Sequence, residues 1–148
     1  MSKIIIIYGT TGGNTELVCE KVEEVLKESG HEVQLKRAEN SSSEDLADHD
    51  LIVLASPTYN VGQLQEQMHK FFHSLKEQDI KGRRFAVIGL GDSKYEINYM
   101  FESAKILEDG IKSLGGELVH ESLKINMQPV PYLETRVTDW AKEISNSL

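Results

Sequence analysis

The stretch IIIIYGTTGGNTELV, residues 4–18, decides the fold. Four consecutive isoleucines show no alternation of apolar and polar side chains, which is typical of a central parallel strand buried on both faces. A turn of Gly, Thr and Asn without a charged residue follows, and a helical pattern begins at about residue 14. The stretch therefore predicts a strand, a tight turn and a helix, which together form the first part of a β-α-β unit.

The rest of the chain repeats this alternation. Strand patterns are expected at residues 3–8, 31–36, 51–56, 84–90 and 117–126, the last of which can be interrupted. Helical spacing of apolar residues is found at 14–29, between 64 and 75, between 100 and 114, and after Pro131. Residues 38–50 hold five carboxylates without a lysine or arginine, which predicts a solvated loop with a short helical turn.

Strands that alternate with helices require a parallel sheet with helices on both faces and right-handed crossovers. We therefore expect an α/β fold with three layers, a five-stranded parallel sheet and a single domain over residues 1–148. In such sheets a ligand binds at the carboxyl ends of the strands, where the winding reverses. The loops at that edge are residues 9–15, 56–63 and 89–96.

Composition excludes several classes of protein. The charged fraction of 27% is ordinary for a globular protein, and no apolar run approaches the ~20 residues that cross a bilayer. A net charge of −8 argues against a nucleic-acid partner and suits docking to a basic protein surface. The isoleucine run is too short for a signal peptide, and Cys19 is the single cysteine. We expect a cytoplasmic monomer without membrane or nucleic-acid partners.

The first loop is rich in neutral hydrogen-bond donors. It holds three hydroxyl side chains, one amide and three glycines: Thr10, Thr11, Thr15, Asn14, Gly9, Gly12 and Gly13. A helix that begins at about Asn14 directs unpaired N–H groups and its positive dipole end into the same space, which is a geometry that binds phosphate. The glycines do not fit G-x-G-x-x-G, and no lysine completes a Walker loop. The alternative is an ordinary capped turn without a ligand.

The other two loops each present a tyrosine after a buried strand. They read SPTYNVGQLQ at 56–65, with Tyr59, and GLGDSKYE at 89–96, with Tyr95. Asn60 and Gly62 both tolerate a positive φ. Two tyrosines at the rim of a phosphate site predict a flat aromatic ligand held between them.

The motifs TTGGNTE, SPTYNVGxLQ and GLGDSKYE, in this order and spacing, resemble those of flavodoxins, and the length resembles their short-chain form. The resemblance covers essentially the whole chain. It implies the strand order 2-1-3-4-5. It also implies a low-potential one-electron carrier with non-covalently bound FMN, which shuttles electrons between redox enzymes and has no substrate reaction of its own.

The resemblance also implies where FMN is held. Residues 10–15 would bind the phosphate, Tyr95 would stack on the outer face of the isoalloxazine, Tyr59 would cover the inner face, and Asp92 would contact the pyrimidine end. The full set of implied cofactor-binding residues is Thr10, Thr11, Gly12, Gly13, Asn14, Thr15, Ser56, Pro57, Thr58, Tyr59, Asn60, Gly62, Gly89, Leu90, Gly91, Asp92 and Tyr95.

Two positions depart from the family pattern. The family loop usually reads [ST]-x-T-G-N-T, so Gly12 stands where a hydroxyl residue is usual, and a phosphate hydrogen bond is lost or supplied by the backbone. Position 59 is often tryptophan. In the family, the carbonyl of the residue after this aromatic, here Asn60, accepts a hydrogen bond from flavin N5 after the first electron. Together with the charge of −8, this predicts two well-separated potentials, the lower one strongly reducing.

Other interpretations of the chain are weaker. A phosphorelay receiver shares the architecture, but its acidic pair should stand where this chain has Tyr8 and Gly9. A flavin-dependent quinone or azo-compound reductase would need additional loops for its substrates. His69 and His73 have the i, i+4 spacing of metal ligands, yet without a third ligand a solvated helix face is favoured.

Overall fold

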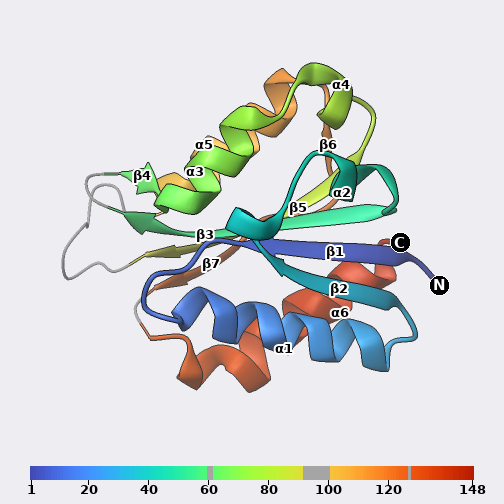
Figure 1. The fold of residues 1–148 in the computed structure, drawn as a ribbon. Coiled ribbons are helices and arrows are strands. Elements are labelled where there is room, and N and C mark those ends of the chain that lie inside the picture. Colours follow the sequence, from blue (N-terminus) through green and yellow to red (C-terminus); the bar gives the residue numbers. More distant parts are fainter. Residues whose placement is uncertain (60–61, 92–100, 127) are drawn as a thin grey trace.

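The computed structural model describes residues 1–59, 62–91, 101–126 and 128–148. A parallel sheet lies between two layers of helices (Figure 1). One face is covered by α1 (Asn14–Glu28) and α6 (Thr138–Asn146). The other is covered by α3 (Glu66–Ser74), α4 (Glu77–Ile80) and α5 (Glu102–Ser113). The predicted α/β fold with three layers is confirmed.

The sheet has the predicted strand order, with one short strand added. Its long parallel strands follow one another across the sheet as β2 (Glu32–Arg37), β1 (Lys3–Tyr8), β3 (Leu51–Tyr59) and β5 (Arg84–Gly91). The fifth position is shared by β6 (Glu117–Leu118) and β7 (Leu123–Asn126), which pair with the beginning and the end of β5. The order 2-1-3-4-5 is thus confirmed, with its last strand interrupted. The short β4 (Gln63–Leu64) is added beside β3.

The isoleucine run of β1 explains why the sheet is buried on both faces. Ile4 and Ile6 pack in the core beneath α1 and α6, whereas Ile5 and Ile7 pack in the core beneath α3 and α5. All four side chains are 0% exposed. Burial of each side chain stabilises the fold by about 1.5–3 kcal/mol, so this one strand contributes to the stability of both cores.

Three strands extend beyond their predicted ends, and β2 does so by one residue, to Arg37. β3 runs to Tyr59 rather than residue 56, because Thr58 and Tyr59 pair in antiparallel fashion with β4. β5 runs to Gly91 rather than residue 90, because Gly91 pairs with Asn126 of β7. The expected loops at 56–63 and 89–96 are therefore strand at their beginnings.

Further differences lie in short helical segments. Residues 38–50 are predicted to form a loop with one short helical turn. They contain two such turns, η1 (Ala38–Asn40) and α2 (Glu44–Ala47). The C-terminal helix does not open at Pro131. That residue lies in η2 (Val130–Tyr132), and the π-helical turn η3 (Leu133–Val137) precedes α6. Among the described residues, no helix combines the length and apolar character needed to span a membrane.

Candidate functional site

The carboxyl ends of β1, β3 and β5 meet at one edge of the sheet (Figure 1). Tyr8, at the end of β1, is in register with Ala55 of β3, and the next residue of β3 is in register with Gly89 of β5. The N–H of Gly9 donates to the carbonyl of Ala55 at 3.0 Å, which continues the ladder one step into the first loop. The loops that the sequence singled out are therefore neighbours.

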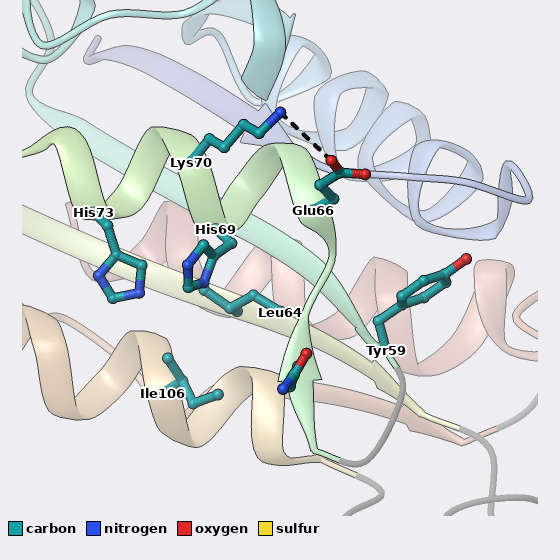
Figure 2. Close-up of a pocket in the computed structure, with 8 residues that line it drawn as sticks. Tyr59, Leu64, Glu66, His69, Lys70, His73 and Ile106 are labelled. Carbon is teal, nitrogen blue, oxygen red and sulfur yellow. Dashed lines mark ion pairs between the residues drawn. The ribbon is translucent and has the colours of Figure 1, made fainter.

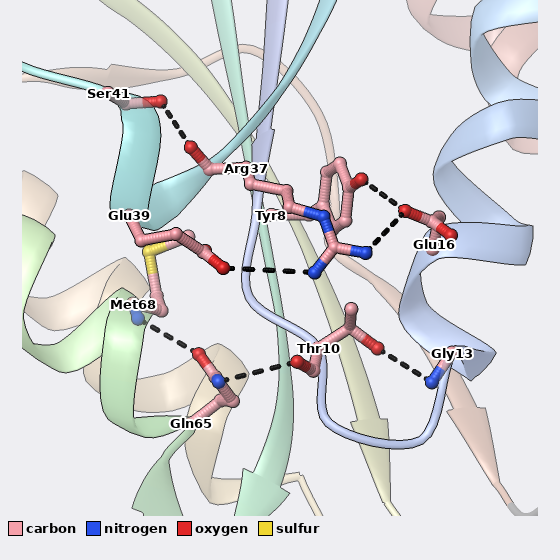
Figure 3. A network of polar contacts seen from close by, with 9 residues as sticks. All are labelled: Tyr8, Thr10, Gly13, Glu16, Arg37, Glu39, Ser41, Gln65 and Met68. Carbon is pink, nitrogen blue, oxygen red and sulfur yellow. Dashed lines mark hydrogen bonds and ion pairs between the residues drawn. The ribbon is translucent and has the colours of Figure 1, made fainter.

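Helix α1 begins without a side-chain cap. Its N-cap residue is Gly13, with φ of 92°, which has no side chain that could accept a hydrogen bond from the first turn. The hydroxyl of Thr10 instead accepts the Gly13 N–H at 3.0 Å, which closes the loop on itself (Figure 3). A Cβ placed on Gly12 would meet nothing within 4 Å. The loop thus presents helix N–H groups next to open space, an arrangement that suits an anion.

The loop residues differ in their exposure. Thr11 and Gly12 are exposed, Thr10, Gly13 and Asn14 are half-buried, and Thr15 is only 1% exposed. Gly9, although it belongs to the same loop motif, offers no N–H group to a ligand. Its N–H bonds to β3, and a Cβ there would overlap Gln65 Oε1 and lie 3.0 Å from the Cβ of Met68. Gly9 is a packing glycine.

Hydroxyl groups at the end of β3 are engaged within the protein. Ser56 Oγ donates to the carbonyl of Pro57 at 2.9 Å. Thr58 Oγ1 donates to Ser103 Oγ at 3.0 Å and accepts the Ser103 N–H at 3.3 Å, in the first turn of α5. Ser103 Oγ then donates to the carbonyl of Ser56 at 3.1 Å. These bonds fix the end of β3 to α5. Tyr59 follows, with 41% of its surface exposed.

The end of β5 is shaped by packing. Gly89 is buried, and a Cβ there would lie 2.7 Å from the Cβ of Ala104 in α5. Leu90 is 4% exposed, and Gly91 is the half-buried last residue of the strand. Three further predicted site residues, Asn60, Asp92 and Tyr95, lie outside the described residues. Gly62 has φ of 74°, the positive value expected of it.

A charged network that sequence reasoning missed lies beside the first loop, residues 9–15 (Figure 3). Arg37 Nη2 lies 3.2 Å from Glu16 Oε2, in the first turn of α1, and Nη1 lies 3.7 Å from Glu39. Tyr8 donates its hydroxyl hydrogen to Glu16. Burial, and then this hydrogen bond, raise the pKa of Tyr8 to about 12. No local pattern indicates this network, because Arg37 follows the strand predicted at residues 31–36 and meets Glu16 of α1 only in the folded chain.

A groove of about 510 Å³ opens beside Tyr59, between α3, β4 and α5 (Figure 2). Its lining residues are Tyr59, Gln63, Leu64, Glu66, His69, Lys70, His73 and Ile106. His69 and His73 are exposed, as a solvated helix face requires, and their ring centres lie 4.2 Å apart. In the described part of the chain, no three His, Cys, Asp or Glu residues are placed to share a metal ion.

Comparison with known proteins gives the family. The family model described as Flavodoxin matches residues 6–140. The chain belongs to the flavodoxin family. It is 30% identical to the flavodoxin of Maridesulfovibrio salexigens over 151 aligned positions, which cover 100% of both chains.

Solved structures agree. The crystal structure of oxidised flavodoxin 2 from Bacillus cereus has a TM-score of 0.86 and 30% identity, covering 99% of each chain. Flavodoxin from Fusobacterium nucleatum, solved with flavin mononucleotide, has a TM-score of 0.84, covering 100% of this chain and 99% of that one; at 22% identity it supports the fold alone. Family membership identifies this short-chain flavodoxin as an FMN-based electron-transfer protein rather than an enzyme.

Proposed function

We propose that this flavodoxin carries single electrons at low potential on non-covalently bound FMN, between redox enzymes that dock through basic surfaces. The observation that carries this proposal is the beginning of α1. A helix without a side-chain cap starts at a loop of neutral donors, on the same edge of the sheet as the exposed Tyr59. One feature suits a phosphate and the other suits a flat aromatic ring.

The described residues fit the two ends of FMN in different ways. The loop from Thr10 to Thr15 would bind the phosphate through N–H groups and hydroxyls, since Gly12 opens onto free space. Tyr59 would cover one face of the ring system. Other proposed site residues shape the floor of the site through the backbone and packing rather than through free side chains: Ser56, Pro57, Thr58, Gly89 and Leu90.

When bound, FMN supplies the one-electron chemistry. The chain sets the potential at which it works. The phosphate loop contains no lysine or arginine, and the nearby Arg37 is already paired with Glu16 and Glu39. Negative charge on the phosphate and on a protein of net charge −8 therefore raises the energy of further negative charge on the ring, which lowers the potential of the second electron.

The same charge gives the proposed partners. A protein with 24 acidic and 16 basic residues attracts a basic surface over a distance set by the ionic strength. We propose that the reductases and oxidoreductases that exchange electrons with this chain present lysine and arginine around their redox centres. Electron-transfer rates with such a partner should fall as salt is added.

Titration of the apoprotein with FMN tests the proposal directly. Flavin fluorescence should be quenched at one equivalent, and a spectroelectrochemical titration should then resolve two one-electron steps, the second at strongly reducing potential. NAD(P)H alone should leave the bound flavin oxidised until a separate reductase is added. Unquenched fluorescence would refute the cofactor proposal, and reduction by NAD(P)H alone would favour a reductase.

The cellular location and the oligomeric state of the chain are also part of the proposal. We propose that the chain works as a cytoplasmic monomer. Sedimentation equilibrium of the FMN-loaded protein should give a mass near 17 kDa, the 16.7 kDa chain with one cofactor. A mass of twice that value would show that two copies associate.

A further inference from the structure

Gln65 is a buried polar residue next to the proposed phosphate loop. It directly follows β4, is the N-cap residue of α3, and only 5% of its surface is exposed. A glutamine side chain carries an acceptor oxygen and a donor NH₂ group, and burial without partners costs about 1–3 kcal/mol for each group. The partners that it finds therefore indicate what it does.

Both groups of the Gln65 side chain are engaged, and they bind different segments (Figure 3). Oε1 accepts the Met68 N–H at 3.0 Å and so caps α3. Nε2 donates to the carbonyl of Thr10 in a long hydrogen bond of 3.5 Å. The backbone N–H of Gln65 donates to Ser56 Oγ at 3.0 Å. One residue thus joins the phosphate loop, the end of β3 and the beginning of α3.

The packing around Gly9 supports the same contact. A Cβ on Gly9 would overlap Gln65 Oε1 and lie 3.0 Å from Gln65 Cδ. The amide group therefore lies directly against the backbone of the phosphate loop. Thr10, whose carbonyl it binds, also accepts the Gly13 N–H through its hydroxyl at 3.0 Å. A continuous chain of contacts leads from Gln65 to the N-cap of α1.

We propose that Gln65 is a positioning residue for the phosphate-binding loop. By holding the Thr10 carbonyl against α3, it fixes the loop in its binding conformation before the ligand arrives. A preorganised loop loses less conformational entropy on binding, so the effect should appear in affinity for the phosphate group. This inference rests on the proposed function, because the ligand of the loop is taken to be the phosphate of FMN.

Two substitutions separate this role from capping. Gln65→Ser keeps a residue type preferred at helix N-caps but cannot reach Thr10. Gln65→Glu keeps the acceptor for the Met68 N–H and replaces the donor with an oxygen that faces the Thr10 carbonyl. Gln78→Ser is the matched control, since Gln78 is exposed on α4. Each apoprotein is titrated with FMN and with riboflavin, which has the same ring system without the phosphate.

We expect both Gln65 variants to bind FMN about tenfold more weakly, the size of effect that one lost hydrogen bond produces. Riboflavin affinity should change less than twofold, and Gln78→Ser should behave as the wild type. Equal losses for FMN and riboflavin would show a merely structural role, and unchanged FMN affinity would overturn the inference. If the wild type itself fails to bind FMN, the proposed function falls and the inference with it.

Amide hydrogen exchange on the apoprotein gives a second readout that needs no ligand. The Gly13 N–H is held by Thr10 Oγ1, so its exchange reports whether the loop keeps its conformation. Exchange at Gly13 should accelerate in both Gln65 variants and not in Gln78→Ser. Protection equal to that of the wild type would contradict the proposal.

Discussion

Replacing Gly12 with threonine is expected to tighten FMN binding about tenfold. The family loop usually carries a hydroxyl residue here, and this chain has glycine. The structure can accept the change, because Gly12 is exposed, its φ lies outside the left-handed region, and a Cβ would meet nothing within 4 Å. Neighbouring Gly13 is different, since its φ of 92° disfavours any other residue.

The magnitude follows from one added hydrogen bond. A hydrogen bond to a charged group contributes about 1.5–3 kcal/mol, and fixing a side-chain rotamer takes back part of it, on the order of 0.5–1 kcal/mol. The net gain of about 1–2 kcal/mol corresponds to roughly a 5- to 30-fold decrease in Kd. Separately, replacing glycine restricts the unfolded chain and should stabilise the apoprotein by about 0.4–1 kcal/mol.

Fluorescence-quenching titrations of the wild type, Gly12→Thr and Gly12→Ala test this reasoning. The alanine variant gains the restriction of the unfolded chain without the hydroxyl, so its FMN affinity should match that of the wild type. Riboflavin affinity should be the same in all three proteins. If Gly12→Thr binds FMN no more tightly than Gly12→Ala, the phosphate is already saturated by backbone N–H groups and the argument is wrong.

Three further predictions, two of them on substitutions, test other parts of the molecule. Gly89→Ala should lower the free energy of unfolding by about 1–3 kcal/mol in urea titrations, because the added carbon would lie 2.7 Å from a side-chain carbon of α5. Burial raises the pKa of Asp45, but hydrogen bonds from the Ser42 N–H and from Lys36 outweigh it, and the net pKa lies below its ordinary value. Asp45→Asn should therefore be less stable than the wild type at pH 7, and the difference should shrink as the pH falls below about 4. Cys19 is completely buried, which raises the pKa of its thiol, so thiol reagents should modify it only after unfolding.

The fold could be predicted because its strongest signals are local. An unbroken isoleucine run indicates a strand buried on both faces, and the structure divides these side chains between two cores. The ends of the strands could not be predicted in the same way. β3 reaches Tyr59 only because β4, a segment of two residues, folds back on it, and pairs so short leave no periodic signal.

In the candidate site, too, local features could be predicted and contacts between distant elements could not. The proposed phosphate loop is contiguous in sequence, so its donors and the beginning of α1 could be predicted together. Gln65 and Arg37 could not, because each acts across an interface between elements that the order of residues does not reveal. The packing roles of Gly9 and Gly89 likewise depend on the tertiary structure. Glycine in a loop motif suggests space for a ligand, and here it provides space for a neighbouring helix.

A loop without charged residues can meet two opposing requirements, tight binding of the phosphate and a low potential of the ring. A lysine in the loop would hold the FMN phosphate more tightly, but its charge would also stabilise an electron on the ring and raise the potential. Helix N–H groups and hydroxyls bind the phosphate without a full positive charge. Arg37 lies close by, yet Glu16 and Glu39 offset its charge, so the network orders the loop's surroundings without adding a net cation. Affinity must then come from how rigidly the neutral donors are held, and this is the contribution that Gln65 makes through Thr10.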